Sequence, residues 1–388
     1  MRKILVVYGT RPEAIKVAPL IKALARSPHF DTVVAVTGQH RQMLDQVNSL
    51  FAITPDHDLN IITERQELQG ITQRALEGVS NVVAEVRPDA VLVQGDTTTC
   101  FAAALAAFYR KVPVFHLEAG LRTGNLYDPF PEEMNRQLVS RIAALHLAPT
   151  ATSRQNLLRE GIAAEHISIT GNTVIDALLD VATRNRPFEN PDLDRLAGRR
   201  TILVTAHRRE SWGEPMARAA RAMARIAQRF PDTVLLLPAH LNPAVREVLL
   251  PVLQGLDNVL VTAPLGYGDF VKAMQASTLV LTDSGGVQEE APSLGKPVLV
   301  MRETTERPEA VEAGTVRLVG TDEERIVREV ATLLTDAAAY AAMAQAVNPY
   351  GDGQASQRCV EAIEHHFGLA ARPADFSPAD EGQRVAAE

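Results

Sequence analysis

Acidic side chains follow predicted strands at positions suited to proton transfer. Asp96 comes directly after the apolar run 90–94, and Glu118 follows the apolar run 112–117. If these successive strands are neighbours, both carboxylates point into one crevice at the carboxyl edge of a sheet. Glu132 stands at a predicted helix start after a proline-rich loop. Carboxylates that converge near a bound anion can have pKa values far apart, which suits proton transfer.

Two of these acids also have a purely structural explanation. Asp96 could be the N-cap of a helix, and Glu132 could complement a helix dipole. No helix start is evident at Glu118, so this acid is the hardest of the three to explain by a structural role.

Two glycine-containing turns are predicted to bind anions. Gly-Thr-Arg-Pro-Glu at 9–13 joins the apolar run 4–8 to a helical pattern, and Asp-Ser-Gly-Gly at 283–286 follows the apolar run 278–282. Glycines let a diphosphate approach backbone amides at a helix start, and a serine hydroxyl adds a donor. Taken alone, the second turn is explained equally well as a helix N-cap. One such loop in each half of the chain predicts a ligand held between two domains.

Further polar side chains lie where they would complete such a site. Glu290, at least one turn along the helix predicted after the second loop, could accept from both hydroxyls of a ribose. His207 follows the apolar run 201–205 and could act as acid or base near neutral pH. Arg208 and Arg209 come next and would suit a pyrophosphate, although such a turn could also be a solvated surface loop.

Strand-length apolar runs alternate with helical patterns along the chain. They are rich in Val, Leu and Ile and mostly do not alternate with polar residues, which is typical of parallel strands covered on both faces. The runs occupy 4–8, 32–37, 90–94, 112–117, 144–148, 167–170, 201–205, 233–237, 258–262, 278–282, 297–301 and 316–319. Repeated strand–helix units predict an α/β protein of two Rossmann-like, doubly wound domains facing a cleft.

Domain boundaries follow from polar and proline-rich stretches. We predict an N-terminal domain of residues 1–171 that carries the catalytic carboxylates, completed by a C-terminal helix at about 353–368 that crosses back to it. The second domain is 172–350 and contains the second predicted anion loop. Residues 369–388 are rich in Ala, Pro and charge and are expected to form a flexible tail.

Composition excludes several classes of protein. The net charge of -8 argues against nucleic-acid binding by bulk attraction. Cys100 and Cys359 have no Cys or His at metal-ligand spacing, so no metal site and no disulfide are expected, and a reducing compartment, the cytoplasm, fits. The apolar stretch 100–109 is too short to span a bilayer and is expected to be a buried core helix. Neither a P-loop nor the usual dinucleotide fingerprint occurs.

Taken together and in order, the motifs resemble those of the non-hydrolysing UDP-N-acetylglucosamine 2-epimerases over residues 1–368. Each matching segment is weakly specific alone, whereas the ordered set is highly specific. The segments are 9–13, 38–41, 95–97, 118–122, 131–136, 207–210, 240–243, 283–294 and 304–309.

The resemblance implies a fold like that of the GT-B glycosyltransferases and assigns roles by motif match. Ser284, Gly285 and Gly286 would hold the diphosphate, Glu290 the ribose, and Phe270 would lie beside the uracil. The first domain would add the substrate-binding cations Arg11, Lys16 and Arg136. The residues that match groups essential to catalysis are Asp96, Glu118, Glu132 and His207.

The implied reaction converts UDP-N-acetylglucosamine reversibly to UDP-N-acetylmannosamine and needs no redox cofactor. Anti-elimination of UDP gives bound 2-acetamidoglucal, and UDP adds back after C2 is protonated on the other face. The cations and loop amides can stabilise the departing diphosphate, the acids can move the proton, and domain closure would keep water away. Which carboxylate acts first stays open.

Further properties come from the resemblance alone. Some bacterial members bind a second, activating UDP-N-acetylglucosamine, and a homodimer and a role in surface-polysaccharide synthesis are also implied. The residues that match the activating site are Gln39, His40, Gln42, Arg65, Gln66 and His240.

The alternative functions are a UDP-sugar glycosyltransferase of GT-B type, a hydrolysing epimerase, and a nucleotide-sugar sensor without turnover. No interaction with nucleic acid or a membrane is expected.

Overall fold

Most of the predicted apolar runs become strands of two parallel sheets in the computed structural model. It describes residues 1–38, 41–63, 67–184, 186–208 and 211–378. The described chain divides into two compact units: unit 1 contains residues 1–177 and 350–378, and unit 2 contains 178–349. The chain passes from unit 1 to unit 2 inside α7 (Thr173–Ala182), shortly after the predicted boundary at Gly171.

Unit 1 is built on a seven-stranded parallel sheet in the order β3-β2-β1-β4-β5-β6-β7. The strands are β1 Arg2–Tyr8, β2 Phe30–Val36, β3 His57–Asp58, β4 Ala90–Gln94, β5 Val114–Leu117, β6 Leu145–Ala148 and β7 Ile167–Ile169. The strand order reverses between β1 and β4, which is where ligands bind in open α/β sheets. Of these strands, β3 was not predicted, because it has only two residues, both polar.

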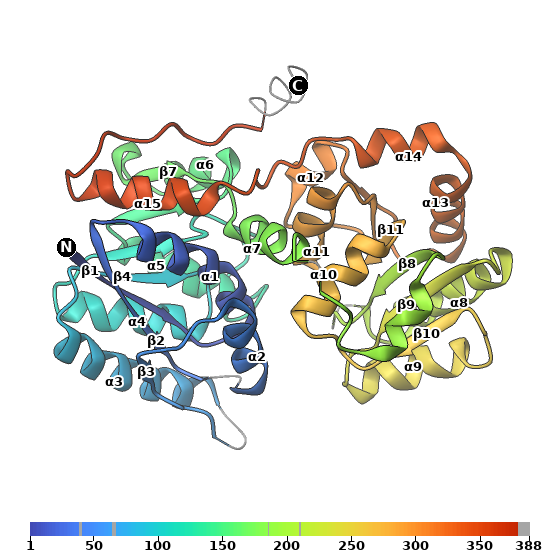
Figure 1. Ribbon diagram of the computed structural model, residues 1–388, viewed down its shortest axis with the longest axis horizontal. Helices are drawn as coiled ribbons and strands as arrows, with labels where there is room; N and C mark the ends of the chain where they lie inside the picture. The colour runs from blue at the N-terminus through green and yellow to red at the C-terminus, as the bar shows by residue number, and fades with distance from the viewer. Residues whose placement is uncertain (39–40, 64–66, 185, 209–210, 379–388) are drawn as a thin grey trace. The chain divides into compact units, whose positions relative to one another are not determined.

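Helices cover both faces of this sheet (Figure 1). On one side α3 packs on α4, and α4 on α5; on the other, α1 packs on α2 and α15. The helices of unit 1 are α1 Arg11–Arg26, α2 Arg41–Phe51, α3 Leu68–Val86, α4 Thr98–Tyr109, α5 Glu132–Ile142, α6 Ala151–Arg159 and α15 Ala355–His366. The prediction of a buried helix at 100–109 is wrong at its end, where Phe108 and Tyr109 are exposed.

Unit 2 has the same architecture, with a six-stranded parallel sheet in the order β10-β9-β8-β11-β12-β13. Its strands are β8 Arg200–Thr205, β9 Thr233–Pro238, β10 Val259–Thr262, β11 Leu279–Thr282, β12 Val298–Val300 and β13 Val316–Leu318. Its helices are α8 Glu214–Arg229, α9 Pro243–Leu253, α10 Tyr267–Ala276, α11 Gly285–Glu290, α12 Pro308–Glu312, α13 Glu323–Thr335 and α14 Ala337–Ala344. The order reverses between β8 and β11, so each unit is doubly wound, as predicted.

The C-terminal segment belongs to unit 1 as far as the structure describes it. Ser27 donates to Glu364 of α15 at 2.9 Å. Beyond that helix, the backbone N–H of Phe376 donates to the carbonyl of Ile169, and Asp375 accepts from the N–H of Ile169. The prediction of a flexible tail from 369 is therefore wrong up to Phe376, because the buried Phe376 ring and these bonds fix the segment on β7. Residues 379–388 lie outside the described part.

Within the described residues, no helix has the length and apolarity needed to cross a membrane.

Candidate active site

Each reversal of strand order is flanked by loops that the sequence singled out. In unit 1 the loop after β1 is Gly9–Thr10, and the loop after β4 carries Asp96. Gly9 is required because a Cβ there would lie 2.0 Å from the hydroxyl oxygen of Thr37 and 2.6 Å from that of Thr99. The loop after β1 therefore packs tightly against the residue that follows β2 and against the first turn of α4.

Glu13 changes the interpretation of the first loop. Its side chain is buried, and one carboxylate oxygen accepts from the backbone N–H groups of Gly9 (3.0 Å) and Thr10 (2.8 Å). The other oxygen accepts from the hydroxyl of Thr97 at 2.6 Å, which ties this loop to the one after β4. The prediction that these loop amides bind an anion is wrong for Gly9 and Thr10, because an internal carboxylate already occupies them. An anion at this edge would be bound by side chains instead.

Glu118 lies directly after β5, in a left-handed backbone conformation with φ of 64°. Its side chain is 6% exposed and receives the Lys16 ammonium at 2.5 and 2.7 Å. The side-chain amides of Gln94 (2.5 Å) and Asn172 (3.0 Å) donate to the same carboxylate. Left-handed φ costs energy for a residue with a Cβ and is typical of functional positions. The donors hold Glu118 in one position.

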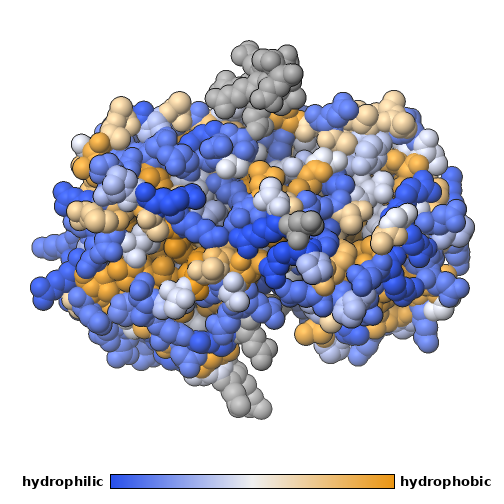
Figure 2. All heavy atoms as spheres, in the orientation of Figure 1, coloured by the Kyte–Doolittle hydropathy of each residue, from blue (hydrophilic) through white to orange (hydrophobic). Residues whose placement is uncertain are grey.

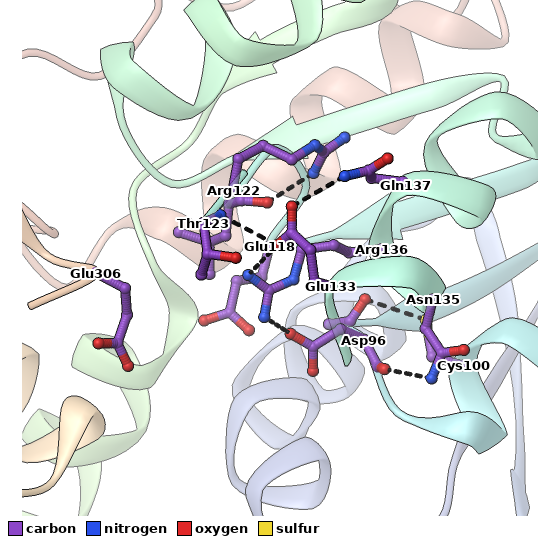
Figure 3. Close-up of polar contacts among 12 residues, drawn as sticks. Asp96, Cys100, Glu118, Arg122, Thr123, Glu133, Asn135, Arg136, Gln137 and Glu306 are labelled. Carbon is purple, nitrogen blue, oxygen red and sulfur yellow. Dashed lines mark hydrogen bonds and ion pairs between the residues drawn. The ribbon is translucent and has the colours of Figure 1, made fainter. Parts of the chain in front are cut away.

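Asp96 is fixed from the side of α5. Arg136 donates to its carboxylate at 2.5 Å, and the side-chain amide of Asn135 donates to its backbone carbonyl at 2.9 Å (Figure 3). Arg136 also donates to Glu133 at 3.2 Å, so one guanidinium joins two carboxylates. Because α5 contacts α4, the predicted acid at the end of β4 and the cation on α5 meet, although forty residues separate them.

The two glutamates at the start of α5 differ in their surroundings. Glu133 is fully buried and accepts from the backbone N–H of Thr123 and the side chain of Gln137. It therefore holds the loop that precedes α5. Glu132, the predicted catalytic acid, occupies the first position of the helix and is half-buried.

Arg122 and the buried His116 have structural roles that were not predicted from the sequence. Arg122 makes two contacts with Glu160, at 2.6 and 2.8 Å, and also bonds Ser140, so it anchors the loop after Glu118. The ring of His116 bonds the carbonyl of Gly95 at 2.7 Å, and burial lowers its pKa to about 3. His116 is therefore neutral, and its ring supports the turn that presents Asp96.

In unit 2, His207 and Asp283 lie at the ends of the neighbouring strands β8 and β11. Asp283 is buried and accepts from the backbone N–H groups of His207 (2.7 Å) and Arg208 (2.9 Å). Its second oxygen lies 3.0 Å from Nδ1 of His207. The ring of His240 stacks near-parallel on that of His207, with centroids 6.0 Å apart.

The second predicted anion loop lies beside a cluster of arginines. Gly285 begins α11, and a Cβ there would lie 2.5 Å from a guanidinium nitrogen of Arg307. Glu306 accepts from Arg208 (3.2 Å) and Arg302 (2.7 Å) and pairs with Arg307 (3.0 Å). Burial alone would raise the pKa of Glu306, but the three guanidinium groups hold it at about 2. The segment 304–309 was predicted as part of a motif, whereas these contacts were not predicted.

The remaining predicted ligand residues of unit 2 lie on α10 and α11. Tyr267 is buried and donates its hydroxyl to Glu290 at 2.8 Å. Phe270, also on α10, is half-buried. Tyr267 therefore positions the carboxylate predicted to bind a ribose, a role that the sequence analysis missed because α10 and α11 are separated along the chain.

Comparison with protein families identifies the chain. A family model described as UDP-N-acetylglucosamine 2-epimerase matches residues 22–364.

The chain belongs to the UDP-N-acetylglucosamine 2-epimerase family.

Individual relatives agree with that assignment. The chain is 56% identical over 377 residues to the UDP-N-acetylglucosamine 2-epimerase of Escherichia coli K12, covering 94% of this chain and 99% of the relative. It is 47% identical to the Neisseria meningitidis UDP-GlcNAc 2-epimerase in a crystal structure bound to UDP-GlcNAc, with a TM-score of 0.87 over 94% and 100% of the chains. The S. aureus MnaA–UDP co-structure is 46% identical, with a TM-score of 0.89 over 97% and 100%.

As a UDP-N-acetylglucosamine 2-epimerase, the protein is an isomerase with the two-domain GT-B-like fold. The glycosyltransferase alternative gains no support from these relatives. The predicted activating residues Gln39, His40, Arg65 and Gln66 lie outside the described residues, and the side chain of Gln42 does too. Among the described residues, no group of three or more His, Cys, Asp or Glu side chains is placed to hold a metal ion.

Proposed function

We propose that this epimerase interconverts UDP-N-acetylglucosamine and UDP-N-acetylmannosamine by elimination and re-addition of UDP. The observation that carries the proposal is the pair Asp96 and Glu118, which end the neighbouring strands β4 and β5, each bonded to a cation. Two carboxylates held at one sheet edge can remove a proton from one face of C2 and return one to the other. The alternative of a sensor without turnover gives no reason for such an arrangement.

In the proposed reaction, a carboxylate of unit 1 takes the C2 proton while the C1–O bond breaks. The electron pair of that bond goes to the β-phosphate oxygen, and 2-acetamidoglucal remains bound. Protonation of C2 on the opposite face and addition of the UDP oxygen to C1 complete the epimerisation. Asp96, Glu118 and Glu132 are the proposed acids and bases, and His207 stabilises the charge on the departing UDP.

UDP is proposed to bind chiefly to unit 2. Ser284 and the amides of Gly285 and Gly286 would take the diphosphate, because glycine lets it approach the backbone. Glu290 would accept from the ribose hydroxyls, and Phe270 would lie beside the uracil. Arg11, Lys16 and Arg136 are the proposed substrate-binding cations of unit 1. The contacts of Lys16 and Arg136 with acids support a further role for both, which is to hold Glu118 and Asp96 in place.

Proton NMR in heavy water tests the reaction itself. Incubating the protein with UDP-N-acetylglucosamine and no acceptor is expected to give UDP-N-acetylmannosamine with deuterium at C2, because the carboxylates exchange their protons with solvent. Free N-acetylmannosamine with UDP would instead show a hydrolysing enzyme. An unchanged spectrum from protein that binds UDP would contradict the proposal.

The bond from Tyr267 to Glu290 leads to a smaller prediction. We expect Tyr267→Phe to weaken UDP binding by about 3- to 10-fold, since a lost hydrogen bond that orients a carboxylate costs about 1 kcal/mol. Isothermal titration calorimetry with UDP and 2′-deoxy-UDP checks it, because the loss should be smaller for the ligand without the 2′-hydroxyl. Tyr340→Phe is the matched control, since its hydroxyl donates to the backbone carbonyl of Thr278 and orients no carboxylate there. Equal losses for both ligands would argue against the ribose role of Glu290.

Further parts of the proposal concern assembly and regulation. We propose a cytoplasmic homodimer that serves surface-polysaccharide synthesis and is activated by a second substrate molecule near His240. Exposed aromatic side chains at the end of α4, Phe108 and Tyr109, support a contact with a second copy. Figure 2 shows hydrophobic residues gathered on the face of unit 1 in view.

A further inference from the structure

The pairing of His207 with Asp283 has a geometry that the sequence motifs do not explain. Asp283 is 1% exposed, and one of its oxygens already accepts two backbone N–H groups. The other oxygen lies 3.0 Å from Nδ1 of His207, which is an ion-pair distance, and it accepts no hydrogen bond from another described residue. The His207 side chain is 40% exposed, so the ring extends from a buried carboxylate toward solvent.

The charge of Asp283 decides which ring nitrogen carries a proton. Burial alone would raise the pKa of Asp283, but the His207 ring and the two N–H groups hold it below its usual value. An ionised carboxylate only accepts hydrogen bonds. The neutral ring of His207 is therefore stabilised with its proton on Nδ1, which leaves the lone pair on Nε2, the nitrogen that does not face Asp283.

We propose, on the basis of the proposed function, that Asp283 is a positioning residue that fixes His207 in the Nδ1–H tautomer and presents Nε2 to the diphosphate. In the protonated ring, Nε2–H donates to the β-phosphate oxygen as the C1–O bond breaks. The Nδ1–H stays on the side of Asp283, and the carboxylate stabilises the imidazolium. The proton stays on Nε2 while the C1–O bond breaks and while UDP returns to C1, so His207 acts through a hydrogen bond and its charge, and no proton is transferred to UDP.

A merely structural role for Asp283 is the alternative, because its backbone bonds fix the loop after β8. The substitution Asp283→Asn separates the two explanations. The side-chain oxygen of the introduced asparagine can still accept the two backbone N–H groups, whereas its NH₂ group would face Nδ1 of His207 as a donor. The ring would then be held neutral with its proton on Nε2, and it would lack the imidazolium charge that stabilises the departing diphosphate.

Nitrogen NMR of the histidine rings in the full-length protein tests the tautomer directly. The His207 signal is assigned by its absence in His207→Gln. We expect the neutral ring of the wild type to carry its proton on Nδ1 and that of Asp283→Asn to carry it on Nε2. An Nε2–H tautomer in the wild type overturns the proposal. This outcome is measured on the wild type, so it does not depend on whether an Asp283 variant folds.

Kinetics supply the second readout. We expect Asp283→Asn to lower kcat by roughly 10²–10³-fold with KM and the Kd for UDP within about threefold, as for a lost orienting partner of a catalytic histidine. The matched control is Asp176→Asn, since Asp176 is a buried carboxylate of unit 1 that accepts two backbone N–H groups, those of Ala355 and Ser356. Unchanged kcat in Asp283→Asn overturns the proposal. If the wild type had no epimerase activity but the tautomer of His207 still changed in Asp283→Asn, the pairing of the two residues would be confirmed and the proposed function would be rejected.

Discussion

Replacing Glu118 by glutamine is expected to lower kcat by roughly 10³-fold, the largest effect that we predict for this protein. The carboxylate accepts from Lys16, Gln94 and Asn172, so both of its oxygens are used. Glutamine has one acceptor oxygen, and its NH₂ group would face a donor. A buried donor left without an acceptor costs about 1–3 kcal/mol, and the side chain would turn away from its position. Steady-state kinetics with UDP-N-acetylglucosamine measure the loss.

The same variant should bind UDP almost as the wild type does, because the proposed UDP-binding residues belong chiefly to unit 2. Asp89→Asn is a matched control, since Asp89 is an ion-paired carboxylate just before the opposite end of β4. We expect the control to keep kcat within about twofold, as for a group away from the chemistry. If kcat of Glu118→Gln stayed within about tenfold of the wild-type value, the catalytic role of Glu118 would be contradicted and only a structural role would remain.

Glu306→Gln is expected to lower the free energy of unfolding by up to about 3 kcal/mol at neutral pH. Three arginines hold the pKa of Glu306 at about 2, below its usual value. A lowered folded-state pKa stabilises the protein above the unfolded pKa, and that stabilisation disappears as the pH falls through the folded value. The difference between wild type and variant should therefore shrink between about pH 5 and pH 2.

Urea unfolding at several pH values measures this difference, with Glu312→Gln as an exposed control in the same unit. The substitution also removes one negative charge from among Arg208, Arg302 and Arg307 beside Gly285, while Arg307 keeps its ion pair with Glu289. A bound diphosphate would supply that charge, so UDP should raise the Tm of the variant more than that of the wild type. An equal rise in Tm in both proteins would argue against a diphosphate at this loop.

Local patterns in the sequence were enough to predict most of the strands, the two parallel sheets and the loops at their carboxyl ends. Short apolar runs such as Ile4–Tyr8 fit buried strands, because a parallel strand covered on both faces buries every side chain. The capping pair of Thr10 and Glu13 was not predicted, although its partners are only three residues apart along one helix start. It explains why the first loop does not offer those amides to an anion.

What only the tertiary structure decided is the partner of each polar group. Glu118 takes its donors from residues 16, 94 and 172, and Glu306 its cations from 208, 302 and 307. Glu133 is buried and Glu132 is not, although both begin the same helix. These outcomes depend on which strands are neighbours and how the helices pack. Periodicity in one segment carries no information about its neighbours, so sequence alone determined the positions of the acids and the fold determined their charge, orientation and partners.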